Sequence, residues 1–240
     1  MPLAGAGRRF AAEAFTMPKP LVPVAGRNMV DWAISNLDPA RTAEWHFFVQ
    51  EEHLRQFPAL HRILSQAGER VQIHQLKKTT PSPIHTLNCG QQDWIDSGLV
   101  LITNCDQFLA ESVKPWADAF TATDAAVGVL TVGTSAAHYV HMAVNIDGAV
   151  IKVIGKGQSE APAAAGYYFF RSGAMLGDLC NQLLAGQSDQ HELCVTDLVA
   201  AALNNGATVR AWNLGPAGKR YFPLGDPDFV RRYERDLALL

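Results

Sequence analysis

The stretch Met1 to Leu21, MPLAGAGRRFAAEAFTMPKPL, places a glycine-rich turn and three cations directly after a short apolar segment. Gly5 and Gly7 lack a Cβ and tolerate positive φ, so the backbone can turn tightly and point several N–H groups at an anion. Arg9 and Lys19 add positive charge near that turn, and a guanidinium is a planar fork that suits phosphate oxygens. The pattern predicts a strand, a phosphate-binding turn and a helix.

Two common glycine-rich sites do not fit this turn. A dinucleotide fingerprint, G-x-G-x-x-G/A, needs a small residue at its last place, where Phe10 stands in this chain. A Walker loop needs Gly-Lys-Ser/Thr after the turn, and no such run follows. The sequence therefore argues against a nicotinamide or flavin site and against a P-loop. Most short Gly/Ala turns bind nothing, so the turn alone does not decide the function.

The composition fits one α/β domain. The 240 residues are 48% hydrophobic and carry a formal net charge of −3, which is no excess charge for coating nucleic acid. The four cysteines form no CxxC pair and indicate reduced thiols in a cytoplasmic protein. No stretch approaches the roughly 18 apolar residues that span a bilayer. We therefore expect a single domain over 1–240, a cytoplasmic location, and neither a nucleic acid nor a membrane as partner.

Short apolar runs alternate with helical patterns along the first half of the chain. Because strands that alternate with helices build a mainly parallel sheet, this half predicts a series of βαβ units. The expected strands are 45–49, 71–74, 99–102 and 125–130, and the expected helices are 29–37, 51–66 and 86–95. In the second half we expect a β-hairpin over 138–154, a strand over 167–170 and a helix over 195–204.

Five segments follow one another in a familiar order over nearly the whole chain: LAGAGRRF, PKPLVPVAGRNMVDWAISNL, LITNCDQFL, GYYFFRSG and ELCVTDLVAAALNNGATV. Together they resemble the sugar-1-phosphate nucleotidyltransferase family, also called nucleoside-diphosphate-sugar pyrophosphorylases. The most specific features are an arginine ten residues before the lysine of Pro18-Lys19-Pro20-Leu21, and the triplet Asn104-Cys105-Asp106 after an apolar run.

The resemblance implies a Rossmann-like nucleotidyltransferase fold of the α/β class. Its mainly parallel central sheet would be flanked by helices and would carry an inserted β-hairpin region. Residues 1–130 would form a nucleotide-binding half, and residues 131–240 would form an acceptor or sugar-binding half.

The resemblance also implies roles for individual residues. Arg9 and Lys19 would bind the triphosphate of an NTP, and Asp106 would hold a Mg²⁺ ion, which makes these three the predicted catalytic residues. Without the resemblance, Lys19 could equally be interpreted as a solvated lysine in a loop, and Asp106 as an acidic residue in a turn after a strand. The residues expected to lie against the nucleotide are Leu3, Ala4, Gly5, Ala6, Gly7 and Asn104.

For the acceptor, the resemblance points to Lys156, Gly166 and Glu192. Lys156 matches a lysine that meets the acceptor phosphate, and Gly166 matches a glycine whose backbone contacts the sugar. Glu192 and Asp197 lie near acids that shape the sugar pocket, although a helix-start Glu and a surface Asp explain them nearly as well.

The implied reaction joins an NTP to a sugar 1-phosphate or a similar phosphorylated metabolite and releases pyrophosphate. It would make a nucleotide sugar for polysaccharide or cell-envelope synthesis. The attacking phosphate is already anionic, so the protein would need to supply placement, positive charge and Mg²⁺ but no side-chain base.

Several positions depart from the family pattern. A Gly-x-Ala segment that contacts the base is replaced by Thr79 to Thr86, so the base cannot be assigned. Gly155 stands where an acid precedes Lys156, and Pro223 stands where a second metal-binding Asp is expected. Asp226 is a conjectural substitute for that carboxylate. The chain also begins almost inside the glycine-rich loop, which leaves few residues for the first strand unless others precede Met1.

These departures keep two alternatives open. The first is a catalytically weak or inactive homologue that binds a nucleotide or nucleotide sugar in a regulatory role. The second, ranked lower, is a glycosyltransferase of related fold, because its Asp-x-Asp motif would need an acid where Asn104 stands. The C-terminal arginines Arg231, Arg232 and Arg235 fit either a solvated helix face or a contact between two copies of the chain in a homodimer.

Overall fold

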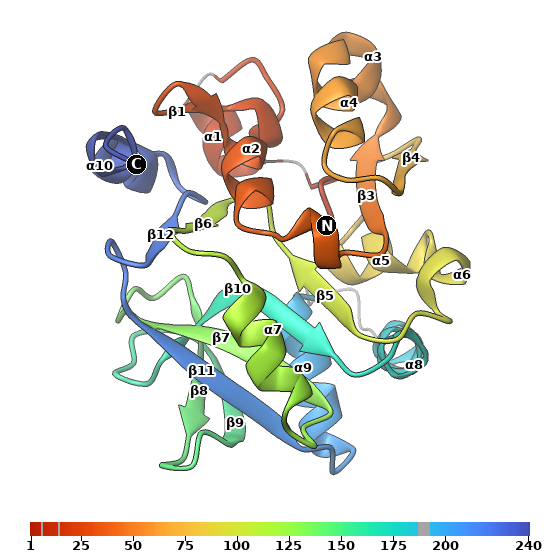
Figure 1. Cartoon of the computed structure of the whole chain (residues 1–240), viewed down its shortest axis with the longest axis vertical. Coiled ribbons are helices and arrows are strands. Elements are labelled where there is room, and N and C mark those ends of the chain that lie inside the picture. Colours follow the sequence, from red (N-terminus) through yellow and green to blue (C-terminus); the bar gives the residue numbers. More distant parts are fainter. Residues whose placement is uncertain (6, 14, 187–192) are drawn as a thin grey trace. The chain divides into compact units, whose positions relative to one another are not determined.

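The computed structural model describes residues 1–5, 7–13, 15–186 and 193–240, which are drawn in Figure 1. They form two compact units. Unit 1 consists of Met1–Thr79, Asn104–Lys114 and Gly218–Leu240, and unit 2 consists of Thr80–Thr103 and Pro115–Ala217. The predicted single domain, with its nucleotide-binding and acceptor-binding halves, stays a prediction.

Unit 1 contains the glycine-rich turn and the segment around Asp106. Its helices are α1 (Arg8–Ala12), η1 (Lys19–Leu21), α2 (Met29–Ser35), η2 (Pro39–Arg41), α3 (Glu51–Gln56), α4 (Pro58–Ser65) and α10 (Pro227–Leu237). Its strands are β1 (Pro23–Val24), β2 (Arg27–Asn28), β3 (Trp45–Gln50), β4 (Val71–Leu76), β6 (Gln107–Leu109) and β12 (Tyr221–Pro223).

The strand pair β3–β4 is parallel, with Trp45 opposite Val71 and Gln50 opposite Leu76. The segment that leads into the glycine-rich turn runs beside β3. Pro2 forms a parallel bridge to Phe48, and the Leu3 N–H donates to the Phe48 carbonyl at 2.8 Å. Parallel strands need a crossover connection, and α3 and α4 supply it between β3 and β4. The predicted strand–turn–helix order is therefore present at the beginning of the chain, although the first strand is reduced to a single bridge.

The sequence predicts one helix over 51–66, but the structure has two helices there, α3 and α4, so the prediction of a continuous helix was wrong. Phe57 ends α3 with φ −128° and ψ 76°, which is not helical, and Pro58 begins α4. A proline has no N–H to continue the helix and disfavours helical geometry at the residue before it, so the break follows from the sequence.

The core of unit 1 joins the chain's beginning to its end. Phe222 and Leu224 from the β12 segment and Val230 and Tyr233 from α10 pack in one cluster with Phe10 of α1. The antiparallel pair β12–β6 then sets Pro223 opposite Gln107, one residue after Asp106. This packing holds α1, the Asp106 segment and the β12–α10 connection in one body.

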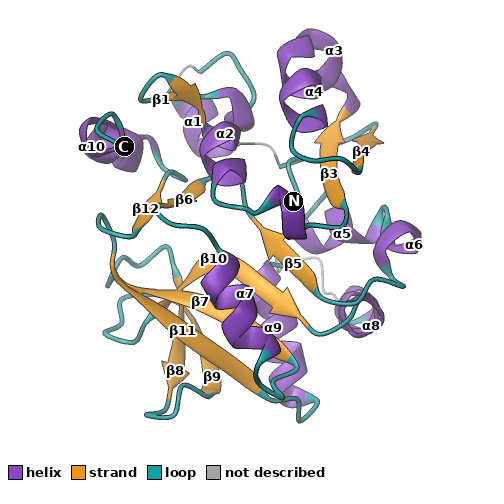
Figure 2. Ribbon diagram, viewed as in Figure 1, coloured by secondary structure: helices purple, strands orange, loops and turns teal. Residues whose placement is uncertain are grey.

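Unit 2 is built on a six-stranded sheet, shown in orange with its helices in purple in Figure 2. The order is β11-β7-β10-β8-β9, and β5 also pairs with β10. Its strands are β5 (Val100–Thr103), β7 (Val127–Gly133), β8 (Val140–Val144), β9 (Val150–Lys156), β10 (Ala163–Phe170) and β11 (Val209–Pro216). Its helices are α5 (Pro83–Asn88), α6 (Gln91–Trp94), α7 (Lys114–Thr121), α8 (Gly173–Ala185) and α9 (Val195–Asn204).

The α/β class is confirmed, whereas the sheet of unit 2 is mixed. β10 is antiparallel to β5, β7 and β8, and β8–β9 is the predicted hairpin. Short connections lead from β7 through β8 and β9 to β10, and such connections favour antiparallel neighbours. β7 and β11 are parallel, because α8 and α9 lie between them in the chain and supply a crossover. All eight residues of β10 are buried, so this strand forms the centre of the core.

Arg171 closes one end of this core. Its guanidinium donates to the carbonyls of Phe120 (3.2 Å), Thr123 (2.5 Å) and Ala125 (2.7 Å), and it lies 4.4 Å from the centre of the Phe120 ring. The Phe120 carbonyl lies in the last turn of α7, and the carbonyls of Thr123 and Ala125 lie in the segment between α7 and β7. The residue is therefore structural, and it was not among the predicted site residues.

Candidate active site

The glycine-rich turn begins α1. Gly7 has φ 59° and ψ 29°, in the left-handed region that glycine adopts without strain, and its carbonyl accepts from the N–H groups of Phe10 (3.0 Å) and Ala11 (3.1 Å). Leu3 and Ala4 are buried, and the Ala4 carbonyl accepts from the Gln50 side chain at 2.9 Å. Gly5 is exposed. Ala6, also predicted to contact the nucleotide, lies outside the described residues.

Lys19 lies on the short helix η1, which follows Pro18. Pro18 is extended, with φ −63° and ψ 145°, and its carbonyl accepts from the Leu21 N–H at 2.9 Å. Pro20 occupies the next position and is buried. The two prolines fix φ on either side of the lysine, so the backbone around Lys19 is rigid.

The structure brings two predicted catalytic residues into direct contact. The Lys19 Nζ lies 2.5 Å from the Asp106 Oδ2, and the side chains are 23% and 22% exposed. The Asp106 carbonyl accepts from the Leu224 N–H at 2.8 Å, and Arg9 Nη1 donates to the Gly225 carbonyl at 3.1 Å. The short loop after β12 therefore forms hydrogen bonds with both Asp106 and Arg9.

The charges of these residues depend on one another. Burial would raise the pKa of Asp106, but the charge and hydrogen bond of Lys19, with a contribution from Arg9, keep that pKa below its ordinary value. Burial would lower the pKa of Lys19, and its attraction to Asp106 outweighs this, so the lysine pKa is raised. Both groups are therefore ionised near neutral pH. Removing either one would leave a partly buried charge without its partner.

Gly225 lets the loop approach the carboxylate. A Cβ at this position would lie 2.7 Å from Asp106 Oδ2 and 3.3 Å from its Cγ, which is closer than real Cβ contacts. Any side chain at residue 225 would therefore push the carboxylate or the loop away. No sequence pattern marked this residue, because the requirement comes from a neighbour 119 positions away, the difference between 225 and 106.

We predict that Gly225→Ala lowers the catalytic efficiency of the reaction that the resemblance implies about tenfold to a hundredfold, because an added methyl group displaces the Asp106 carboxylate. The midpoint of thermal unfolding should fall less than on loss of the carboxylate, since the charge that pairs with Lys19 is still present. Steady-state kinetics and calorimetry measure the two effects. Gly98→Ala is a matched control for added bulk, since Gly98 is not among the proposed site residues and a Cβ there meets nothing within 4 Å. Unchanged kinetics in Gly225→Ala would contradict a positioning role for residue 225.

Asp226 is not a ready substitute for a second metal-binding carboxylate. Its Oδ1 accepts from the Asp228 N–H at 3.0 Å, so it is the N-cap of α10, with Pro227 as the first helical residue. Among the described residues, no three His, Cys, Asp or Glu side chains gather into a metal-binding set. Asp106 is thus the carboxylate that unit 1 offers at this site.

The predicted acceptor residues lie in unit 2 or outside the described residues. Lys156 is exposed at the end of β9, and Gly166 lies in β10 with φ 81°, a left-handed conformation that favours glycine. Asp197 accepts from the Cys194 N–H at 2.6 Å, which makes it a capping residue of α9. Glu192 lies outside the described residues. Asn104 is half-buried in unit 1, two residues before Asp106.

Residues 79–86 stand where the family pattern leads one to expect a Gly-x-Ala segment. The polar side chains of this segment form hydrogen bonds mainly with one another and with its own backbone. Ser82 is the N-cap of α5, and its Oγ lies 2.9 Å from His85 Nδ1. The hydroxyl oxygens of Thr80 and Thr86 are 2.5 Å apart, and Thr86 also donates to the Ser82 carbonyl at 3.1 Å. These polar groups therefore order the start of α5.

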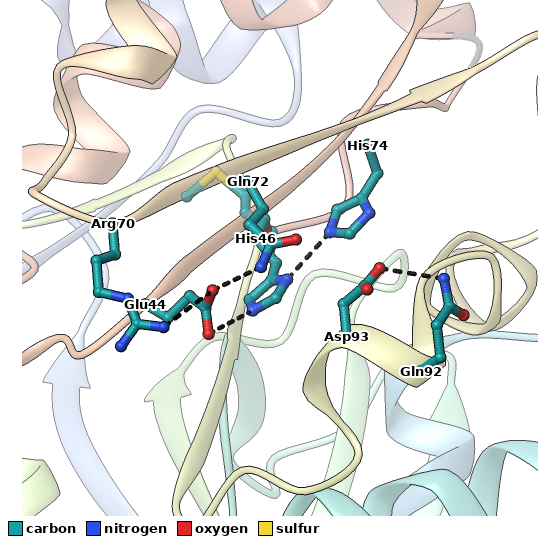
Figure 3. Close-up of polar contacts among 8 residues, drawn as sticks. Glu44, His46, Arg70, Gln72, His74, Gln92 and Asp93 are labelled. Atoms are coloured by element: carbon teal, nitrogen blue, oxygen red, sulfur yellow. Dashed lines mark hydrogen bonds and ion pairs between the residues drawn. The ribbon is translucent and has the colours of Figure 1, made fainter.

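A second polar cluster lies on the β3–β4 pair and contains none of the predicted residues (Figure 3). Glu44 accepts from Gln72 at 2.6 Å and lies 3.6 Å from His46 Nε2. His46 Nδ1 is 3.0 Å from His74 Nε2. The Gln72 hydrogen bond, with smaller contributions from His46 and Arg70, lowers the pKa of Glu44. The cluster stabilises a charged Glu44 directly before β3.

Comparison with known protein families identifies the chain. Residues 3–164 match the model of the MobA-like NTP transferase domain, which includes both the glycine-rich turn and Asp106. The chain belongs to this family. As a MobA-like NTP transferase, the protein is an enzyme of the nucleotidyltransferase type, which confirms the recognition made from its motifs. A comparison with curated proteins finds no match.

Solved structures share the fold of this MobA-like protein. A nucleoside-diphosphate-sugar pyrophosphorylase from Vibrio cholerae RC9 superposes with a TM-score of 0.81 at 16% identity, covering 98% of this chain and 100% of its own. A Bacillus anthracis protein assigned as a glucose-1-phosphate thymidylyltransferase gives 0.80 at 16% identity, with 99% and 93% covered. The inositol-1-phosphate CTP transferase from T. maritima gives 0.74 at 14% identity, with 99% and 94% covered. The Rossmann-like nucleotidyltransferase fold is therefore confirmed.

Across the described part of the chain, no helix combines the length and the apolar character that crossing a bilayer requires.

Proposed function

We propose that this MobA-like protein transfers a nucleotidyl group from an NTP to a sugar 1-phosphate or a similar phosphorylated metabolite. A phosphate oxygen of the acceptor attacks the α-phosphorus, the bond from that phosphorus to the bridging oxygen breaks, and pyrophosphate leaves. The product serves nucleotide-sugar synthesis in the cytoplasm, for polysaccharide or cell-envelope assembly. The observation that carries the proposal is the Lys19–Asp106 pair beside the glycine-rich turn and Arg9. The names of the structural neighbours favour a phosphorylated sugar or polyol as acceptor.

The residues of unit 1 supply what this transfer needs. The side chains of Arg9 and Lys19, beside the glycine-rich turn, would form a cationic region for the triphosphate. Negative charge builds up on the pyrophosphate as it leaves, and these cations would stabilise it. The acceptor phosphate is an anion and needs no proton removed. Lys156 and Gly166 of unit 2 are the proposed acceptor contacts. The Lys156 side chain is exposed, whereas Gly166 is buried and has a φ of 81°.

The donor set fits one Mg²⁺ ion held jointly with the substrate. In nucleotide enzymes Mg²⁺ is bound through one or two carboxylates plus phosphate oxygens, and Asp106 offers one carboxylate that is kept ionised. When bound, the ion would neutralise phosphate charge and align the phosphate oxygens. Asp106 is therefore the proposed metal ligand.

One observation favours a second candidate, a homologue that binds a nucleotide without turnover. Pro223 lies opposite Gln107 in the β12–β6 pair, next to Asp106, where the family pattern leads one to expect a second carboxylate. A site with one carboxylate could retain nucleotide binding while losing rate.

The deciding experiment is a pyrophosphate-release assay with Mg²⁺, four NTPs and a panel of sugar 1-phosphates and phosphorylated polyols. We expect release only with one NTP and one acceptor together. If the folded protein releases none with any pair, while an NTP still raises its melting temperature, the binding homologue replaces the enzyme. Omitting the acceptor controls for simple NTP hydrolysis.

A further inference from the structure

The charges around Asp106 do not favour a bare divalent cation. One carboxylate faces two cations, because Lys19 contacts Asp106 directly and Arg9 acts on both residues through its charge. The sum over these three side chains is +1, from two positive charges and one negative. A divalent ion that approaches this part of unit 1 is therefore repelled on balance. Because these side chains are partly buried, dissolved salt screens this repulsion less than it would screen repulsion between exposed charges.

The ammonium of Lys19 also occupies one of the two carboxylate oxygens. Nζ lies 2.5 Å from Oδ2, and Gly225 approaches the same oxygen from the loop after β12. Asp226, the nearest acidic residue in that loop, is committed to the N-cap of α10 through its Oδ1. Among the described residues of the loop after β12, Asp226 is therefore engaged in capping a helix and does not pair with Lys19.

A triphosphate reverses this balance. An NTP brings about four negative charges at neutral pH, and it offers Lys19 and Arg9 anionic partners in place of Asp106 and the Gly225 carbonyl. Once Lys19 turns to phosphate, the Asp106 carboxylate is free for a cation that the nucleotide already neutralises in part. Metal and nucleotide would then each strengthen the binding of the other.

We propose that Lys19 is the resting counter-ion of Asp106, so that the divalent cation enters with the nucleotide and not before it. This inference rests on the proposed function for the role of Asp106, and it adds the order of loading and the residue that enforces it. Lys19 thus acts twice, first as a block on metal binding and then as a phosphate ligand.

The test measures Mn²⁺ binding by water-proton relaxation and by the amplitude of the free-ion EPR signal, without any turnover. We expect wild-type protein to bind Mn²⁺ weakly alone and to form an enhanced complex after an NTP is added. Lys19→Met should bind Mn²⁺ alone at least about tenfold more tightly than wild type, because the repelling charge is gone. Lys77→Met is the matched control, since it removes an exposed lysine from unit 1, and it should behave like wild type.

The double variant Lys19→Met with Asp106→Asn should lose the gain, which assigns it to this carboxylate. Equal Mn²⁺ affinity in wild type and Lys19→Met without nucleotide would overturn the inference. If circular dichroism shows that Lys19→Met is unfolded, Lys19→Gln takes its place. The wild-type comparison with and without NTP remains decisive in either case, since tight binding of Mn²⁺ alone contradicts the block. Failure of the proposed function has a different signature, because no NTP would then bind or be consumed, whereas the gain in Lys19→Met needs no nucleotide.

Discussion

Asp106→Asn should lower kcat/KM for pyrophosphate release at least about a hundredfold, a loss of roughly 2.7 kcal/mol of transition-state stabilisation. Asparagine keeps the shape of the side chain and removes the charge that holds a cation. It also leaves the Lys19 ammonium, 23% exposed, without its carboxylate partner. We therefore expect a lower unfolding midpoint as well, since an unpaired, partly buried charge is costly.

Kinetics and calorimetry on the same preparations separate the two effects. Asp147→Asn makes the same chemical change in the exposed turn of the β8–β9 hairpin and should leave both quantities unchanged. Added nucleotide should restore part of the lost stability in Asp106→Asn, because phosphate can pair with Lys19. A variant that keeps more than about a tenth of the wild-type kcat/KM would remove Asp106 from the catalytic residues.

The elements with strong periodicity could be predicted from the sequence. The helix over Val195–Asn204 has the predicted bounds, and the hairpin β8–β9 lies within the predicted 138–154 apart from its last two residues. Both segments combine a clear hydrophobic pattern with a turn or stop signal at the end. Local propensity and tertiary packing favour the same structure in these segments, so the sequence pattern alone predicts them.

Sheet direction was harder to predict because it depends on connection length as well as on strand pattern. A buried strand such as β10 is apolar on both faces whether its neighbours are parallel or antiparallel. The apolar run of β10 therefore does not predict the direction of the neighbouring strands. The short connections from β7 to β10 held the missing information. Likewise, Pro58 marked the break between α3 and α4 that periodicity had bridged.

The candidate site was recognised by motif, but its contacts could not be. The Lys19–Asp106 ion pair joins residues 87 positions apart, and the close approach of Gly225 joins residues still farther apart. Only the folded chain sets those distances. The role of Asp226 was available in the sequence, because an Asp followed by Pro is a helix start in which Asp caps and Pro takes the first helical place.

Among the glycines of unit 2 at which a Cβ would meet a neighbouring atom, Gly173 should be the position where substitution by alanine destabilises the protein most. A Cβ at Gly173 would lie 2.2 Å from the Trp94 carbonyl oxygen and 2.6 Å from that of Ile95, and both are backbone atoms that cannot rotate aside. The Gly173 N–H also donates to the Ser97 carbonyl at 2.8 Å, which holds the start of α8 close to that turn.

Two opposing terms decide the sign of this change. Alanine favours a helix over glycine by about 0.5–1 kcal/mol, whereas overpacking typically costs about 1–3 kcal/mol, and contacts this close to fixed backbone belong to the upper part of that range. The clash therefore wins, and we expect a net loss of about 1–2 kcal/mol and a fall in the unfolding midpoint of about 2–8 °C. Differential scanning calorimetry measures both. Gly98→Ala, four residues from Trp94 and open within 4 Å, is the matched control and should shift the midpoint by less than about 2 °C. A midpoint for Gly173→Ala equal to that control would mean that α8 can withdraw from the Trp94–Ser97 turn at little cost.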